Sequence, residues 1–320
     1  MTIALGLNTE AFLDWPLTRI LDWLLTRTPE ITALEVLAGG YCGTGHCDSE
    51  LLLRDPQQRQ KWRTEFDRRN LQLVALNVSG NPLHPNPEIA EEHDRALRRA
   101  IQLAPQIGVD RLVAMSGCPG AAETDRAAPH FCANAWLPDY QGIVDWQWEE
   151  RILPYWQNIS ELAAREHPSL RICLELHPGA AAYNTNTFTR LAGVGSNIAV
   201  NLDPSHFFWQ SMDPLAIIDR LGDRIGHAHA KDTVLFPENL ALNGLLDNRW
   251  PGDPAEMPWN FATVGHGHDR AWWQLFVQAL VSTGFEGTLA IEHEDPLVAA
   301  EEGIIEGAHL LSEVIRGSGA

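Results

Sequence analysis

The sequence predicts a single domain, residues 1–320, that folds as a (β/α)₈ barrel. Eight short apolar runs alternate with longer amphipathic runs of helical period. The returns from helix to strand are short, whereas three connections from strand to helix are long. A doubly wound open sheet would give the same alternation, but it would gather the chemistry at one switch point rather than at many strand ends.

The predicted strands share an apolar body and a polar C-terminal end. They span residues 3–9, 33–38, 71–78, 111–117, 171–178, 197–204, 225–232 and 287–295. Between them lie runs such as 87–108, whose apolar residues recur at helical spacing beside charges. The long connections follow the second, fourth and seventh strands, at 39–56, 118–146 and 233–269. Structureless insertions of this size are typical of lids or binding loops, at the end where barrels keep their sites.

Composition narrows the functional classes. The chain has 42 acidic and 23 basic residues and a formal net charge of −19, which disfavours a nucleic-acid partner because phosphate contacts need clustered cations. The N-terminus lacks a basic region, and no run approaches the roughly 20 apolar residues that span a bilayer. We therefore expect a soluble, cytoplasmic protein without a membrane partner. Five sparse cysteines do not form a disulfide framework.

Polar side chains gather at the ends of four consecutive strands. In "RIGHAHAKDT" (224–233), strand alternation puts His227, His229 and Lys231 on one face and small residues on the other. The neighbouring strands repeat this decoration with Glu175 and His177, with Asn201 and Asp203, and with Glu292 and Glu294. These side chains are predicted to point towards one axial pocket.

Burying so many like charges is costly unless a cation compensates them. Glu175, Asp203, His229 and Glu292 offer three carboxylates and one imidazole. This oxygen-rich set suits one divalent ion, Mn²⁺, Mg²⁺ or Co²⁺, at least as well as Zn²⁺. Any one of the four alone would more often be an ordinary ion-paired residue; four at matched strand ends favour a metal site.

Five motifs carry a resemblance to a known family: "CLELHP", "LDPSH", "HAHAKD", "VGHGHDRAWW" and "AIEHED". With them, nearly the whole chain resembles the sugar phosphate isomerase/epimerase-like barrels, the group of xylose isomerase-like enzymes and endonuclease IV (AP endonuclease family 2). The resemblance implies that Glu175, Asp203, His229 and Glu292 are the metal ligands. It also implies that Glu175 and Glu292 form the catalytic acid/base pair.

The activity implied by this resemblance is that of a metal-dependent isomerase or epimerase of a keto sugar, which abstracts an α-proton and forms a metal-stabilised enediolate. His177, His206 and Lys231 remain alternative bases or substrate clamps. A lyase, either an inosose-type dehydratase or an enzyme that cleaves a 3-keto glycoside by β-elimination, would begin with the same proton abstraction. Endonuclease IV-like DNA repair conflicts with the net charge, and a non-catalytic sugar-binding barrel is the remaining alternative.

Other residues are candidates to contact a small-molecule sugar. Asn8, Glu35, Asn77 and Ser116 stand at predicted strand ends, where they either bind hydroxyls or cap the strand. The glycine-rich segment 39–48 is predicted to bring His46 to the pocket, because its spacing of cysteine and histidine matches no usual zinc site.

Four of the twelve tryptophans lie in or near the predicted loops: Trp136, Trp209, Trp250 and Trp259. Trp209, six residues after Asp203, is the best placed to cover a sugar ring. The "GHGH" stretch (265–268) is not a phosphate fingerprint; its glycines are expected to let a loop turn near the mouth of the site. The sequence leaves the sugar, the native metal and a homo-oligomeric state open.

Overall fold

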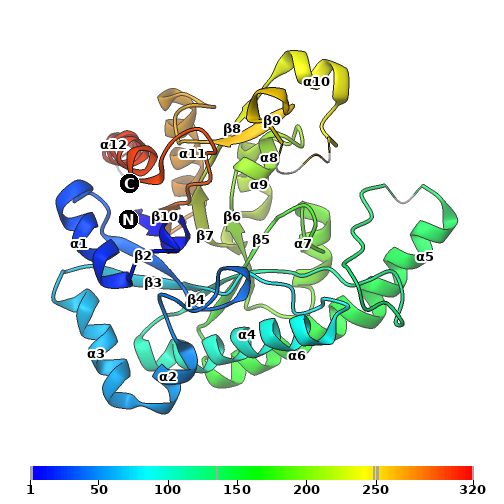
Figure 1. Ribbon diagram of the computed structural model, residues 1–320, viewed down its shortest axis with the longest axis horizontal. Helices are drawn as coiled ribbons and strands as arrows, with labels where there is room; N and C mark the ends of the chain where they lie inside the picture. Colours follow the sequence, from blue (N-terminus) through cyan, green and yellow to red (C-terminus); the bar gives the residue numbers. More distant parts are fainter. Residues whose placement is uncertain (1–2, 135, 248, 250–251, 319–320) are drawn as a thin grey trace. The chain divides into compact units, whose positions relative to one another are not determined.

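The computed structural model describes residues 3–134, 136–247, 249 and 252–318; Trp250 lies outside this part of the chain. Eight strands close into a barrel in the order β1–β10–β7–β6–β5–β4–β3–β2, which confirms the predicted (β/α)₈ architecture (Figure 1). Each strand lies inside a predicted one. Their bounds are β1 Ala4–Asn8, β2 Ala33–Leu37, β3 Gln72–Asn77, β4 Arg111–Met115, β5 Arg171–Glu175, β6 Ile198–Leu202, β7 Ile225–Ala230 and β10 Thr288–Ile291.

Helices connect the strands. They are α1 Leu17–Arg27, α2 Ser49–Arg54, α3 Pro56–Asp67, α4 Pro87–Ile107, α5 Pro138–Trp146, α6 Leu153–Glu166, α7 Thr185–Ala192, α8 Ser205–Phe208, α9 Pro214–Leu221, α10 Pro237–Asn243, α11 Arg270–Ser282 and α12 Ala300–Gly317. Shorter helical segments are η1 Thr9–Phe12, η2 Gly40–Cys42, η3 Gln147–Ile152, η4 Gly222–Arg224 and η5 Pro254–Glu256. None of the described helices is long and apolar enough to cross a membrane.

Helix α4 shows how local sequence sets its own bounds. The Asn86 side chain accepts a hydrogen bond from the Glu88 amide, and Pro87 occupies the first turn, where its missing N–H costs nothing. The helix ends at Gly108, which adopts the left-handed conformation (φ 73°) that a side chain would disfavour. The 3.6-residue period then turns a buried apolar face inwards between these caps.

Contacts divide the chain into two compact units. The first unit comprises Met1–Glu35, Phe66–Gln72 and Leu202–Ala320, and the second comprises Val36–Glu65 and Leu73–Asn201.

In the first unit, strand register brings polar ends to one level. Asn8 pairs with Glu35, Leu7 pairs with Ile291, and Ile291 pairs in turn with Ala230. The residues that follow Ile291 and Ala230, Glu292 and Lys231, therefore emerge beside Asn8 and Glu35. Parallel neighbours in matched register present their side chains to the same face, so four separate strands supply one polar patch.

In the second unit, β4, β5 and β6 pair in parallel, with Met115 opposite Glu175 and Glu175 opposite Asn201. Helices α4 and α6 run side by side (Figure 1). The Tyr155 hydroxyl of α6 donates a 2.9 Å hydrogen bond to Asp94 of α4, which fixes the two helices to each other.

The three long insertions carry secondary structure of their own, so the expectation of structureless loops was wrong. The insertion after β7 contains an antiparallel pair, β8 (Asp232–Leu235) and β9 (Trp259–Ala262), together with α10. The insertion after β4 ends in α5, and the one after β2 contains η2 and α2. These elements are short and lack a long periodic pattern, which is the signal that sequence reasoning uses.

A π-helical segment joins α5 to α6. This segment, η3 (Gln147–Ile152), leads into α6 (Leu153–Glu166), whose second residue is Pro154. Pro154 has no N–H to donate to the carbonyl four residues earlier, so a regular α-helical ladder is interrupted at this point. Such π-turns are frequent at functional sites.

Trp156 is expected to be a principal support of the second unit. It is fully buried, and its indole N–H donates a 2.9 Å hydrogen bond to the Ser116 carbonyl at the end of β4. Trp156→Ala should lower the free energy of unfolding by about 3–5 kcal/mol, because it leaves a cavity. Trp156→Phe keeps most of the packing and should cost less. Urea denaturation monitored by circular dichroism measures both, and equal stability of Trp156→Ala and wild type would contradict this assignment.

Candidate functional site

Three of the four predicted metal ligands lie together in the first unit. Asp203 follows β6, His229 lies on β7, and Glu292 follows β10. One ligand atom from each lies within 4.8 Å of the others. Asp203 and His229 are 0% exposed and Glu292 is 6% exposed, so these are buried ionisable groups that must compensate one another.

The Lys231 ammonium lies among these carboxylates. Its Nζ is 2.6 Å from Glu292 Oε2, 3.1 Å from Asp203 Oδ2 and 2.9 Å from Glu294 Oε2. It also lies 4.6 Å from the centre of the Phe261 ring, a cation–π contact. The lysine is only 2% exposed, so its charge is held in place by these partners rather than by water. We call Asp203, His229, Lys231 and Glu292 the charged cluster.

His229 bridges two carboxylates. Its Nε2 lies 2.9 Å from Glu35 Oε2, and its Nδ1 lies 3.2 Å from Glu292 Oε2. His227 Nε2 contacts the same Glu35 oxygen at 2.7 Å. Glu35 therefore orients both histidine rings, rather than standing free to bind a sugar hydroxyl as one of the expectations had it. On the other side, Asn8 Nδ2 donates to Glu292 Oε1 at 3.0 Å.

The contacts of Glu35, His229 and Glu292 shift the pKa of each group towards its charged form. Burial opposes the charge of Glu35, but His229 and His227 outweigh it and lower the pKa of Glu35 to about 2. Burial likewise opposes the charge of His229, yet the carboxylates of Glu35 and Glu292 raise its pKa well above the ordinary value. Lys231 and His229 hold the pKa of Glu292 well below its usual range despite burial. Because a metal-bound imidazole must be neutral, metal binding at His229 would release a proton.

His206 is buried beside Asp203 at the start of α8. Its Nε2 lies 3.3 Å from Asp203 Oδ2, and its ring packs edge-on against Phe261 with centroids 5.5 Å apart. Burial lowers the pKa of His206 to about 4, although Asp203 opposes this shift. The imidazole is therefore neutral at pH 7 and can donate or accept a hydrogen bond.

Trp209 stacks on Trp259 of β9, with ring centroids 4.7 Å apart and planes 1° from parallel. Both indole N–H groups are buried, and neither has a hydrogen-bond partner within the described part of the chain.

The second unit holds the other predicted site residues. Glu175, at the end of β5, accepts a 3.2 Å hydrogen bond from Asn201, and His177 Nδ1 contacts the Pro178 carbonyl. Asn77 accepts from the Ser79 amide at 2.8 Å. His46 is buried, and its carbonyl accepts a 3.0 Å hydrogen bond from the Trp62 indole.

Ser116 belongs to the same strand-end level of the second unit. Its hydroxyl accepts a 2.7 Å hydrogen bond from the Ala182 amide. Asn77 and Ser116 each use a side-chain oxygen to hold loop backbone at this level.

Asp232 fixes the "GHGH" segment, a role that sequence reasoning missed. Its Oδ2 accepts from the amides of Gly265, Gly267 and His268 at 3.1, 3.1 and 2.9 Å. Its Oδ1 lies 2.8 Å from His268 Nδ1. At Gly267, a Cβ atom would lie 2.1 Å from the Thr233 carbonyl oxygen, so this close approach requires glycine. The aspartate directly after the "HAHAK" strand was the available signal.

The donor set of the charged cluster fits a divalent cation. Asp203 Oδ2 is buried, accepts no hydrogen bond from the described residues, and faces the Lys231 ammonium. The ammonium marks a position where positive charge is stable between Asp203 and Glu292. Carboxylate oxygens and an imidazole nitrogen are suitable ligands for Mn²⁺, Mg²⁺, Co²⁺ or Zn²⁺.

Asp232→Ala should release the segment 263–268. The change leaves several buried or half-buried N–H groups without their acceptor, and we expect the free energy of unfolding to fall by about 3 kcal/mol. Amide exchange at Gly265, Gly267 and His268 should accelerate, as mass spectrometry of peptides would show. Asp253→Ala, which removes a single exposed cap in the same insertion, is the matched control. Unchanged exchange in Asp232→Ala would contradict the anchoring role.

The sequence matches a known protein family over most of its length. Residues 43–314 match the family described as "Xylose isomerase-like TIM barrel". The uncharacterized protein YfiH of Bacillus subtilis (strain 168) is 34% identical over 288 residues, which are 89% of this chain and 91% of that one.

Two solved structures share the fold. A xylose isomerase-like TIM barrel protein from Mycobacterium smegmatis in complex with magnesium has a TM-score of 0.65 at 13% identity, covering 100% of this chain and 98% of that one. The 3-keto-D-glucoside 4-epimerase YcjR from E. coli has a TM-score of 0.58 at 11% identity, covering 98% of each. With the family match spanning most of the residues and the eight-stranded barrel in place, the chain belongs to the xylose isomerase-like TIM barrel family.

Proposed function

We propose that this protein is a divalent-metal-dependent isomerase or epimerase of a keto sugar or sugar derivative, and that it acts by abstracting the proton next to the carbonyl. The observation that carries the proposal is the buried charged cluster at the strand ends of a barrel in this family. Two similar folds, one holding magnesium and one named as a keto-glucoside epimerase, support the same class of chemistry.

Asp203, His229 and Glu292 would hold the cation, and Glu175 would be the fourth ligand. Glu175 pairs in register with Asn201, which stands only two residues before Asp203 in the chain. At such a site a bound divalent cation would supply Lewis-acid polarisation of the substrate carbonyl. The oxygen-rich donor set makes Mn²⁺ our first choice, with Mg²⁺, Co²⁺ and Zn²⁺ as alternatives.

Glu292 and Glu175 are proposed as the pair that moves the proton. Glu292 is fixed at both oxygens, by Asn8 on one and by Lys231 and His229 on the other. Its low pKa keeps it in the ionised form that a general base requires, although the same shift weakens its basicity. Glu175, oriented by Asn201, would return a proton to the enediolate of the substrate. Return to the opposite face of the same carbon gives epimerisation, and return to the neighbouring carbon gives isomerisation.

Lys231, His206 and His177 are proposed to bind the substrate oxygens. The Lys231 ammonium already pairs with Glu292 and has the charge that a developing oxyanion needs. His206 is neutral, so it would bind a hydroxyl rather than a negative charge. Trp209 would cover a ring face, and Asn77 and His46 complete the proposed contacts to a small-molecule sugar. The net charge of −19 leaves nucleic acid disfavoured as a partner.

Deuterium exchange tests the chemistry directly. Metal-stripped protein in D₂O should leave a panel of ketoses, inososes and 3-keto glycosides unlabelled, and Mn²⁺ should restore incorporation at the α-carbon, as NMR would detect. Glu292→Gln should reduce the exchange rate by about 10²–10⁴-fold, the usual contribution of a general base. Glu301→Gln makes the same change at an exposed position of α12 and should not alter the rate.

The outcome also separates the alternatives. Incorporation into recovered ketose or its epimer supports the isomerase proposal, whereas release of water or of an aglycone would identify the lyase. If no candidate shows exchange although one metal ion is bound per chain, the proposed enolisation is wrong. Sugar binding without catalysis would then be the remaining function.

Lys231→Met tests how the charged cluster is balanced. The change removes the cation from Asp203 and Glu292, and breaking a buried ion pair in this way costs about 3–5 kcal/mol. We therefore expect a clear fall in the stability of metal-stripped protein. Mn²⁺ should stabilise Lys231→Met more than it stabilises wild type, because no ammonium competes with it. Lys61→Met, on the exposed surface of α3, is the control. Equal stability of Lys231→Met and wild type without metal would contradict the proposed balance.

A further inference from the structure

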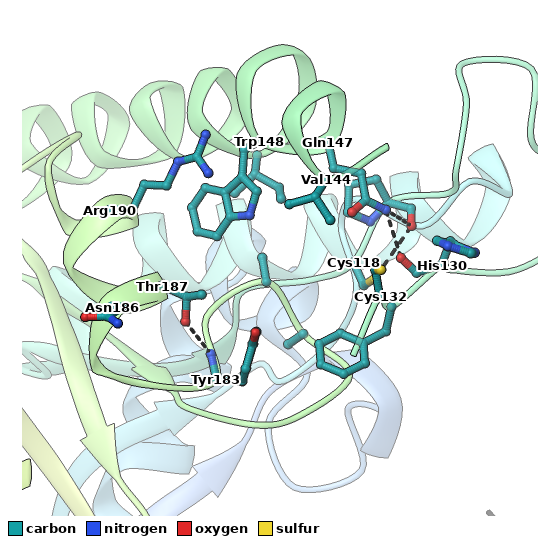
Figure 2. A pocket seen from close by; sticks show the side chains of 15 residues that line it. Cys118, His130, Cys132, Val144, Gln147, Trp148, Tyr183, Asn186, Thr187 and Arg190 are labelled. Atoms are coloured by element: carbon teal, nitrogen blue, oxygen red, sulfur yellow. Dashed lines mark hydrogen bonds between the residues drawn. The ribbon is translucent and has the colours of Figure 1, made fainter. Parts of the chain in front are cut away.

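The second unit contains a cavity that the proposed chemistry does not use. It has a volume of about 270 Å³. It lies where the insertion after β4 and the short loop after β5 meet α5, η3 and α7. Figure 2 shows Trp148 and Arg190 on one side, with Tyr183 and Thr187 opposite. Its apolar lining includes Phe131, Val144, Trp148, Ile152, Ala181 and Tyr183.

The walls of this cavity are fixed by specific hydrogen bonds. The buried Gln147 side-chain amide donates to the carbonyls of Gly120 and His130, at 2.9 and 2.8 Å, and so ties the segment 118–132 to η3. Figure 2 shows Gln147 beside His130. Phe131 packs edge-on against Tyr183, with ring centroids 5.2 Å apart. The cavity is therefore bordered by the segment 118–132 on one side and by α7 on the other.

The lining is aromatic and carries little unpaired polarity. Trp148, 5% exposed, lies in the π-helical segment, and the Arg190 guanidinium stacks 4.5 Å from its ring centre. Arg190 is neutralised by Glu149 at 2.6 Å. The Thr187 hydroxyl accepts from the backbone amides of Tyr183 and Asn184, at 3.0 and 3.1 Å. Such a lining suits a planar, uncharged, apolar group.

The volume of the cavity also suits a small aromatic group. Pockets for drug-sized ligands span about 300–1,000 Å³, so a cavity just below that range suits one or two rings rather than a whole substrate. Gln147 and Thr187 use their hydrogen bonds on the backbone, so most of the remaining lining offers apolar contact to a ring.

The cavity is within reach of Glu175. Ala180, which lines it, stands five residues after Glu175, a separation of at most about 18 Å even for a fully extended chain. The Ala181 amide donates to the Gly117 carbonyl at 2.7 Å, so the loops after β4 and β5 are joined at this wall. The cavity and the end of β5 therefore belong to the same group of loops in the second unit.

We propose that this cavity is the subsite for a planar, uncharged aromatic aglycone, and that the substrate is a keto glycoside rather than a free sugar. The inference rests on the proposed function, because the sugar part must react at Glu175 and Glu292. Burial of the aglycone against Trp148 and Tyr183 would contribute binding energy that a methyl glycoside lacks.

A binding experiment tests the cavity without any chemistry. Fluorine NMR titration would follow 4-fluorophenyl β-D-glucoside, which has no keto group. Ala181→Leu fills the cavity and should weaken binding by at least about tenfold. Val144→Phe fills it from α5 and serves if the first variant does not fold. Ala128→Leu makes the same substitution on the exposed part of the insertion and should bind as wild type does. Unchanged binding in both filled variants, or equal loss in Ala128→Leu, would overturn the proposal.

A kinetic experiment separates this inference from the proposed function. Metal-dependent deuterium exchange is compared for 4-fluorophenyl and methyl 3-keto-glucosides. We expect KM to be at least about tenfold lower for the aryl substrate, and the difference to vanish in Ala181→Leu but not in Ala128→Leu. Exchange with equal KM for both substrates would overturn the aglycone subsite and leave the proposed function intact. Cavity-dependent probe binding without exchange from any keto sugar would overturn the proposed function and the keto-glycoside assignment with it.

Discussion

The neutralisation of buried carboxylates at the strand ends is the constraint on which the first unit depends. Glu35, Asp203 and Glu292 are almost completely removed from water, and an unpaired carboxylate there would cost several kcal/mol. Two cations offset most of this charge: His229 lies between Glu35 and Glu292, and Lys231 lies between Asp203 and Glu292. Strand register supplies this arrangement, because β2, β1, β10 and β7 are successive neighbours.

Much of this could be predicted from the sequence. Period-2 alternation correctly indicated that His227, His229 and Lys231 share a face, and each of the eight barrel strands lies inside a predicted one. The partners could not be predicted, because Glu35 and His227 are 192 positions apart and meet only through the strand order. A strand-end glutamate that binds a hydroxyl and one that orients two histidines have the same sequence pattern; only the tertiary contacts distinguish them.

For the insertions, the sequence predicts less than it does for the barrel strands. Their lengths and positions were evident, but their internal elements were not, because those elements depend on tertiary contacts. The buried Asp232 carboxylate holds the segment around Gly265 and Gly267, and the buried Gln147 amide holds part of the β4 insertion. Neither contact leaves a periodic signal. The π-turn before Pro154 similarly needs both the proline and the packed helix around it.

Lys231 gives the proposed metal site a counter-charge that folding can use without a metal ion. A site built only of carboxylates would repel itself without metal, and folding would then require the cation. Here the Lys231 ammonium contacts both Asp203 and Glu292, so the chain itself supplies part of the charge that offsets them. Under the proposed function, a divalent cation would compete with this ammonium and would displace it from the carboxylates. The displaced ammonium would then be available to a substrate oxygen, so one residue would serve both the fold and the proposed site.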